Sequence, residues 1–182
     1  MLMKILQLMS KSSQVNNAKI MEYALARGRA GKTGFFSRLM QEVIPFNRPH
    51  RIKVEEISSK GCKVLLPYRR RNLNHLGTLH ACAMATAGEY VSGLNVIESF
   101  DISKYRLIMS RLEVDYIRRS IGGCEATSSW PDGMLDSLKK SLHSEGVATF
   151  ILTAKLIDST SEHVATTTTH WHVKDWEKVR AK

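Results

Sequence analysis

The sequence predicts an α+β domain in which one long central helix is wrapped by a curved antiparallel sheet of about six strands. Strand-like runs dominate the chain from residue 50 onward, and one helix-length run interrupts them after the first two. A helix inserted after the first hairpin of an otherwise antiparallel chain indicates this class instead of alternating βαβ winding. The wrapping is one interpretation of the helix composition, a tightly packed core helix being the simpler one: seven of the seventeen residues from Gly77 to Gly93 are glycine or alanine. Backbone can approach such a helix closely on several sides.

The first part of the chain has a helical pattern. Two short amphipathic helices are predicted there, over residues 16–27 and 34–44. Three glycines between residues 28 and 34 separate them, and Pro45 and Pro49 end the helical section. We therefore divide the chain into a basic helical extension, residues 1–48, and a main domain, residues 49–182.

The main domain begins with a predicted hairpin that leads into the central helix. The hairpin pairs residues 51–58 with residues 62–71 around a turn at Ser59-Lys60-Gly61. After a polar loop, the central helix is expected over residues 76–94. Four further strands are predicted over residues 105–119, 124–130, 147–158 and 163–173. A charged helical segment, residues 134–143, lies between the second and third of these.

The chain is strongly basic, with a formal net charge of +10. Residues 1–72 hold 15 Lys and Arg against 4 Asp and Glu, whereas residues 73–182 hold 12 against 13. A basic face attracts polyanions of many kinds, including membrane headgroups, nucleic acid and the phosphates of coenzyme A. Charge alone does not choose among them, so a membrane-surface or nucleic-acid-binding role for the basic helices stays open as a third hypothesis.

The cysteines and histidines favour neither disulfides nor a metal site. Cys62, Cys82 and Cys124 are isolated and form no C-x-x-C pair, which favours reduced thiols and a cytoplasmic location. No signal peptide is predicted at the N-terminus, and no run approaches the roughly 20 apolar residues that span a bilayer. His170 and His172 alternate on one strand face without a third ligand at a suitable spacing. We expect no metal and no cofactor.

One motif carries most of the functional information. The stretch Asn74-His75-Leu76-Gly77-Thr78-Leu79-His80-Ala81-Cys82 opens the central helix, and Glu89 follows within it. It resembles the phenylacetyl-CoA-thioesterase-like branch of the hot-dog superfamily, whose signature is Asn-x5-His-Gly-Gly-x6-Asp. Both spacings are kept, while Ala81-Cys82 replace the two glycines and Glu89 replaces the aspartate. The Arg-rich strand before the motif is also similar to a hot-dog family known only as a domain of unknown function.

The resemblance implies a hot-dog fold and a thioesterase site with four named residues. In such enzymes the backbone N–H after the histidine polarises the thioester carbonyl, which here assigns Ala81. Glu89 is the predicted base or nucleophile, Asn74 holds water or the carbonyl, and His80 shapes the turn. The physics agrees, because a helix N-terminus offers unpaired N–H donors and partial positive charge to a developing oxyanion. Two simpler roles stay open: Glu89 as a solvated carboxylate, and Asn74 as a loop or capping residue.

The spacing also predicts the assembly. Nine residues separate His80 from Glu89, which is roughly 13 Å along a helix that rises about 1.5 Å per residue. The two ends of the site cannot reach one thioester carbon from a single helix. If both take part, they come from two copies of the helix related by a twofold axis. We therefore predict a homodimer or a dimer of dimers.

The main functional prediction is a thioesterase for acyl-CoA or a related acyl thioester, with a composite site at the dimer interface. The alternative is a non-catalytic hot-dog protein that binds acyl ligands or regulates another protein. Arg118 and Arg119, just before a glycine-containing turn, are the predicted contacts of the coenzyme A nucleotide, since arginine suits phosphate geometry. Arg69, Arg70 and Arg71 are a second group of candidate anion contacts. A solvated position at a strand end is the simpler alternative for each arginine.

Overall fold

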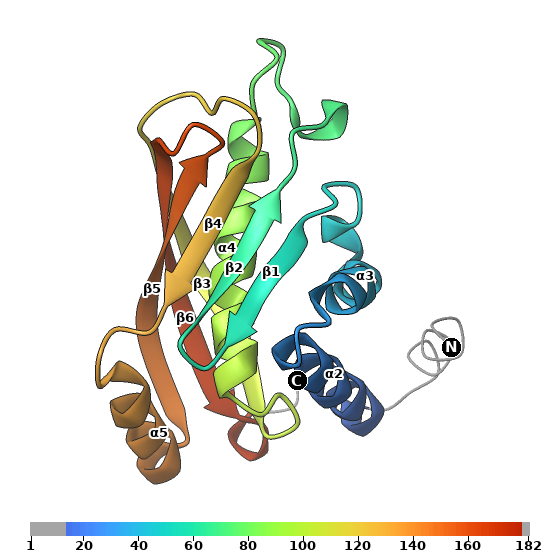
Figure 1. The fold of residues 1–182 in the computed structure, drawn as a ribbon. Coiled ribbons are helices and arrows are strands. Elements are labelled where there is room, and N and C mark those ends of the chain that lie inside the picture. Colours follow the sequence, from blue (N-terminus) through green and yellow to red (C-terminus); the bar gives the residue numbers. More distant parts are fainter. Residues whose placement is uncertain (1–13, 180–182) are drawn as a thin grey trace.

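The computed structural model describes residues 14–179 of the 182-residue chain. Its elements in chain order are α2 (Gln14–Arg29), α3 (Thr33–Val43), β1 (Lys53–Ser58), β2 (Gly61–Leu66), α4 (Ala81–Ser99), β3 (Tyr105–Tyr116), β4 (Cys124–Ser129), α5 (Met134–Glu145), β5 (Val147–Asp158) and β6 (His163–Asp175). Short 3-10 turns lie at Pro45–Asn47, Arg70–Asn72 and Trp176–Lys178. The long helix α4 lies behind β2 and β4 in Figure 1.

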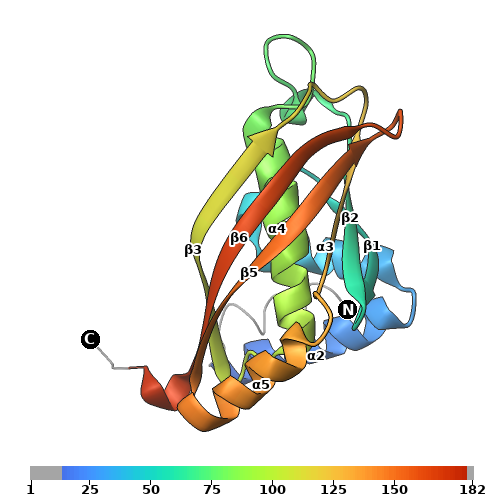
Figure 2. The ribbon, with the colours of Figure 1, turned by 90° about the vertical axis from the view of Figure 1, so that its left-hand side faces the viewer.

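All six strands belong to one sheet in the order β1-β2-β4-β5-β6-β3, and every neighbouring pair is antiparallel. Helix α4 connects β2, near one edge of the sheet, to β3 at the opposite edge. The sheet curves around this helix, as Figure 2 shows. The predicted α+β fold with one central helix and about six antiparallel strands is therefore confirmed.

The small residues of α4 allow the sheet to approach it closely. A β-carbon at Gly88 would overlap the side chain of Thr167 on β6. One turn further along, Ser92 Oγ lies 2.6 Å from Thr169 Oγ1 and accepts a hydrogen bond of 2.8 Å from the indole of Trp171. All three groups are buried, so these bonds satisfy polar atoms inside the core. The small side chains of Gly88 and Ser92 thus allow the backbone of α4 to approach β6 closely.

The helices α2 and α3 cover β1 and belong to the main hydrophobic core. The buried side chains that they contribute are Met21, Ala24, Leu25, Phe36, Leu39 and Met40. These pack in one cluster with residues of β1, β2 and α4. The predicted division of the chain at residue 48 stays a prediction. None of the helices between residues 14 and 179 is long and apolar enough to cross a membrane.

The central helix starts later and ends later than the sequence predicts. Residues 76–80 were expected to be helical, but Gly77 has a φ of 72° and His80 is extended, with a ψ of 139°. The side chain of Asn74 accepts hydrogen bonds from the backbone of this segment and holds it as a loop. At the other end the helix continues five residues beyond 94, to Ser99.

The strand β2 is shorter than expected, ending at Leu66 instead of residue 71. Pro67 follows, and proline has no N–H to donate to a neighbouring strand. The chain then turns through Arg70–Asn72.

Candidate active site

The first turn of α4 leaves one backbone donor free at the positive end of the helix dipole. His80 is the N-cap, and its Nδ1 accepts a hydrogen bond of 3.0 Å from the N–H of Cys82. Its carbonyl accepts the N–H of Ala83 at 3.0 Å. Between residues 14 and 179, the N–H of Ala81 has no acceptor. This is the donor that the motif assigns to the thioester carbonyl, and it lies where partial positive charge is greatest.

The capping hydrogen bond also defines the tautomer of His80. Because Nδ1 accepts a hydrogen bond from the backbone N–H of Cys82, the ring proton of this tautomer lies on Nε2. His80 therefore shapes the start of the helix, as the sequence predicts.

Asn74 organises the loop that leads into α4. Its Oδ1 accepts the N–H of Leu76 at 2.9 Å and of Thr78 at 3.2 Å, and its Nδ2 donates to Thr78 Oγ1 at 3.0 Å. The amide is thus engaged in a local turn of the kind that asparagine favours. This geometry corresponds to the loop role that the sequence left open, while contact with a substrate stays a prediction.

Tyr116, which the sequence did not single out, joins the end of β3 to the start of α4. Its hydroxyl donates a hydrogen bond of 2.9 Å to the carbonyl of Ala81. Burial, together with the nearby Cys82 thiol, raises the pKa of Tyr116 and keeps the hydroxyl protonated as a donor. The peptide of the candidate oxyanion donor is therefore held by a neighbouring strand. An aromatic residue at a strand end carries no such signal in the sequence, because the contact depends on how β3 is placed.

Glu89 is a carboxylate without a partner. It is half-buried, and no hydrogen bond or ion pair joins its side chain to another residue in the described part of the chain. A β-carbon added at Gly93 would lie 3.8 Å from Glu89 Oε1 and 3.4 Å from Trp171 Cη2, so the carboxylate passes over a bare helix turn near an indole edge. Burial raises the pKa of Glu89 to about 7. A group with this pKa can take up a proton near neutral pH.

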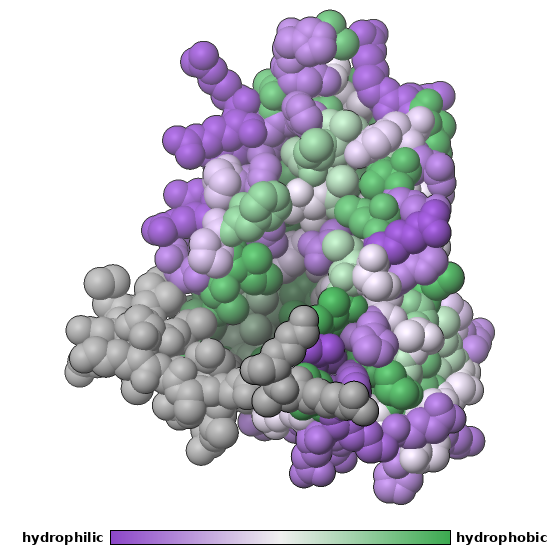
Figure 3. Space-filling model, turned by 180° about the vertical axis from the view of Figure 1, so that it is seen from behind, coloured by the Kyte–Doolittle hydropathy of each residue, from purple (hydrophilic) through white to green (hydrophobic). Residues whose placement is uncertain are grey.

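Glu89 belongs to the least covered stripe of α4. Cys82, Thr86 and Glu89, at spacings of four and three residues, face the same side of the helix and are exposed or half-buried. The opposite side, which includes Ala87, Val91 and Leu94, is fully buried. Figure 3 shows the molecule from behind, where pale and green residues occupy the middle of the face between hydrophilic margins.

Within one chain, the structure does not bring the two ends of the motif together. His80 and Glu89 lie on one continuous helix, nine residues and about 13 Å apart. The free N–H of Ala81 and the carboxylate of Glu89 therefore cannot act on the same carbon from one copy.

Arg118 and Arg119 are exposed, just beyond the end of β3. Arg118 Nη1 lies 2.7 Å from Glu162 Oε2, so much of its charge is already balanced. Their role with a nucleotide stays a prediction. His170 Nε2 lies 3.0 Å from Glu113 Oε1, and no group of three or more potential metal ligands occurs within residues 14–179.

Comparison with known proteins adds a family and a fold. The family model described as a domain of unknown function, DUF4442, matches residues 32–173. The chain belongs to this family. No functionally curated protein matches it.

Several solved structures are similar to this domain. One is a probable thioesterase of unknown function from Pseudomonas aeruginosa, 22% identical, with a TM-score of 0.70 over 75% of this chain and 91% of that one. A thioesterase from Staphylococcus aureus is 14% identical, with a TM-score of 0.60 over 71% of this chain and 98% of that one. A thioesterase from Pseudomonas aeruginosa is 14% identical, with a TM-score of 0.59 over 71% and 86%. The predicted hot-dog fold is confirmed by this likeness.

Proposed function

We propose that this DUF4442 protein hydrolyses acyl thioesters, with acyl-CoA as the predicted substrate, at a site composed from two copies of α4. The observation that carries the proposal is Glu89, a carboxylate that has no partner among residues 14–179 and whose pKa is raised to about 7 on the least covered stripe of α4. The free N–H of Ala81 at the start of the same helix supplies the complementary group.

The proposed chemistry is general-base hydrolysis. Glu89 takes a proton from water, whose oxygen attacks the thioester carbonyl, while the N–H of Ala81 in the other copy stabilises the oxyanion. Collapse of the tetrahedral intermediate breaks the C–S bond, and the protonated Glu89 returns its proton to the leaving thiolate. The products are a carboxylic acid and a thiol, and Glu89 is again a carboxylate. One oxyanion donor can contribute roughly 10²–10³ in rate. Direct attack by the Glu89 carboxylate is the covalent variant of this mechanism.

Two features of the surface support the dimer on which this site depends. In the part of the chain that the structure describes, strand β3 pairs with β6 on one side only and forms an edge of the sheet. Its other row of backbone groups is then available to a second copy. Its Ile108 side chain is 42% exposed. A twofold axis beside this edge would also cover the open stripe of α4 and set the two helices antiparallel.

The alternative function is acyl-ligand binding without turnover. It is favoured by Ala81 and Cys82, which stand where the resembling thioesterases have two glycines. Ala81 keeps its N–H, but its β-carbon narrows the approach to the helix start.

A hydrolysis screen over acyl-CoA chain lengths, with detection of the released thiol, tests the proposal. We expect turnover of some chain length and a loss of at least ~10²-fold in kcat for Glu89→Gln, the low end for a general base. Glu55→Gln, which removes an exposed carboxylate on β1, is the matched control and should retain full activity. Equal turnover by wild type and Glu89→Gln would remove Glu89 from the mechanism. Acyl-CoA binding without turnover at any chain length would establish the binding function instead.

A further inference from the structure

Two arginine-bearing segments that are distant in sequence meet beside α3. One is the turn over residues 48–51, and the other is the turn over residues 69–71. Asn72, fully buried, joins them: its Nδ2 donates to the carbonyls of His50 at 3.0 Å and Pro67 at 2.9 Å. Its Oδ1 also lies 3.0 Å from His50 Nδ1. The buried amide of Asn72 therefore holds the two turns next to each other. Their relative position does not depend on flexible surface side chains.

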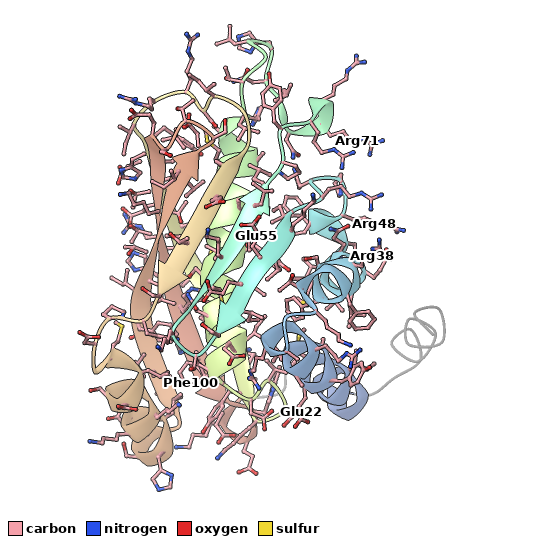
Figure 4. The ribbon with its side chains drawn as sticks, in the orientation of Figure 1. Glu22, Arg38, Arg48, Glu55, Arg71 and Phe100 are labelled. Atoms are coloured by element: carbon pink, nitrogen blue, oxygen red, sulfur yellow. The ribbon has the colours of Figure 1, made fainter. Side chains whose placement is uncertain are left out.

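Four arginines line a pocket at this junction. The pocket has a volume of about 320 Å³, and its walls are Pro45, Arg48, Pro49, Arg51, Arg69 and Arg71. The prolines are rigid and have no N–H, so the polar groups that the pocket offers are mainly guanidinium donors. Figure 4 places Arg71, Arg48 and Arg38 along the same margin of the molecule.

The positive charge in this arginine pocket is largely uncompensated. Arg48 Nη2 lies 3.2 Å from Glu42 Oε1, and Arg51 Nη1 donates to the neutral amide of Gln41 at 3.4 Å. Within residues 14–179, Arg51, Arg69 and Arg71 form no ion pair. Guanidinium groups keep their positive charge near neutral pH. Because like charges repel, bringing several of them into one pocket is unfavourable unless an anion binds between them.

We propose that the arginine pocket, formed by Arg48, Arg51, Arg69 and Arg71, binds a group that carries two or more phosphates. Arginine forks bind phosphate oxygens in pairs, and several forks around one concave site match an anion with several phosphates better than a single carboxylate. This inference deepens the proposed function and rests on it for one point, that the phosphates belong to the carrier of the acyl group.

The connection to the candidate active site is short and rigid. The carbonyl of Asn72 accepts the N–H of His80 at 2.7 Å, and Leu73 pairs with Leu79 as an isolated antiparallel bridge. The turn that carries Arg69 and Arg71 is thereby bonded directly to the residue that caps α4. A carrier held by its phosphates at this turn would be anchored next to a helix N-terminus that is proposed to receive a thioester.

The test compares two double variants that remove the same charge. Arg51→Gln with Arg71→Gln changes two pocket arginines, whereas Lys139→Gln with Lys140→Gln changes two exposed lysines on α5, to which no binding role is assigned. Binding of adenosine 3′,5′-bisphosphate, coenzyme A and inorganic pyrophosphate to the full chain is measured by calorimetry. Binding of vesicles containing anionic phospholipid is measured by cosedimentation.

We expect wild type and the Lys139/Lys140 variant to bind the bisphosphate and coenzyme A alike, and the Arg51/Arg71 variant to lose at least tenfold in affinity for both. Pyrophosphate that competes with the bisphosphate in wild type, but not in the Arg51/Arg71 variant, would support a phosphate site that needs no nucleotide base. The inference is overturned if the two double variants lose affinity equally, since long-range charge alone would then act. It is also overturned if wild type binds only the vesicles, or none of the probes.

These measurements need no turnover. Phosphate binding that is retained when no thioester is hydrolysed would contradict the proposed function and leave the arginine pocket in place. Arg51→Gln with Arg71→Gln is checked for folding by circular dichroism, and Arg71→Lys provides a milder second variant. Arg71→Lys should lose affinity as well, because lysine keeps the charge but lacks the fork.

Discussion

Glu89 combines a titratable side chain with an environment that penalises its charge. An unperturbed glutamate has a pKa near 4.3, whereas burial raises the pKa of Glu89 to about 7. No donor in the described part of the chain compensates the loss of water around this carboxylate. A carboxylate that destabilises its own fold is typical of a functional group, because a purely structural role would favour a paired or apolar side chain.

This perturbed pKa predicts two linked pH dependences. Activity, as kcat/KM, should rise as pH increases through about 7, because the proposed base acts only when deprotonated. Between the unfolded pKa and about 7 the folded state binds more protons than the unfolded state, so the free energy of unfolding should fall as pH rises. The fall should be on the order of 2 kcal/mol for wild type and largely absent in Glu89→Gln. Denaturant unfolding at pH 5 and pH 8 measures it, and an identical pH dependence in both proteins would contradict the assigned environment.

The sequence predicts some of the site's residues better than their contacts. The motif spacing places His80 near the start of the helix and Glu89 nine residues further on, because both positions depend only on distance along one helix. The catalytic roles of these residues stay predictions. The loop contacts of Asn74 and the bond from Tyr116 to Ala81 could not be predicted, since they depend on a local turn and on the placement of β3. The sequence marks Arg69 and Arg71 as candidate anion contacts but does not pair them with Arg48 and Arg51, because the two segments become neighbours only through the buried amide of Asn72.

Helix α4 shows which features of an element can be predicted from composition. Its small residues correctly indicate close contact with the sheet. Its start was predicted five residues too early because the apolar pattern of Leu76 and Leu79 continues through a loop. The positive φ of Gly77 and the capping role of His80 override that pattern.

The close contact predicts opposite outcomes for two glycines of this helix. Gly88→Ala would place a β-carbon into the side chain of Thr167, and we expect a loss of about 1–3 kcal/mol, typical of overpacking. This loss should occur although alanine is intrinsically the better helix former by about 1 kcal/mol. Gly93→Ala is the matched control, since its β-carbon would find ordinary contact distances of 3.4 Å or more, and it should be neutral or stabilising. Urea unfolding of both variants decides this. If Thr167→Ala does not relieve the cost of Gly88→Ala, the close approach is not its cause.

The sequence predicts which helices and strands the fold contains, but it predicts less well how they are placed in space. The alternation of strand patterns around one helix gives the class and the chain order of the elements. The position of β4 between β2 and β5, and of β3 at the far edge, depends on pairing between residues distant in sequence. The packing of α2 and α3 into the main core likewise depends on contacts with β1 that no local pattern encodes.

The assembly leads to the most discriminating prediction, because a composite site can be rebuilt from two inactive proteins. Ala81→Pro removes the proposed oxyanion donor at the first helical position, where proline is well tolerated and the extended His80 suits a following proline. Glu89→Gln removes the proposed base. Each variant alone should form a dimer by light scattering and hydrolyse thioesters at least ~10²-fold more slowly than wild type.

Mixed after reversible dissociation, the two variants should form heterodimers in which one site carries both defects and the other carries neither. Random pairing makes half of the dimers mixed, and each regains one of two sites, so activity should return to roughly a quarter of wild type. Recovery is measured as released thiol against time after mixing, with each variant mixed with itself as the control. If Ala81 and Glu89 acted within one chain, every subunit of the mixture would still lack one group. Activity would then stay at the level of the single variants, although dimers form.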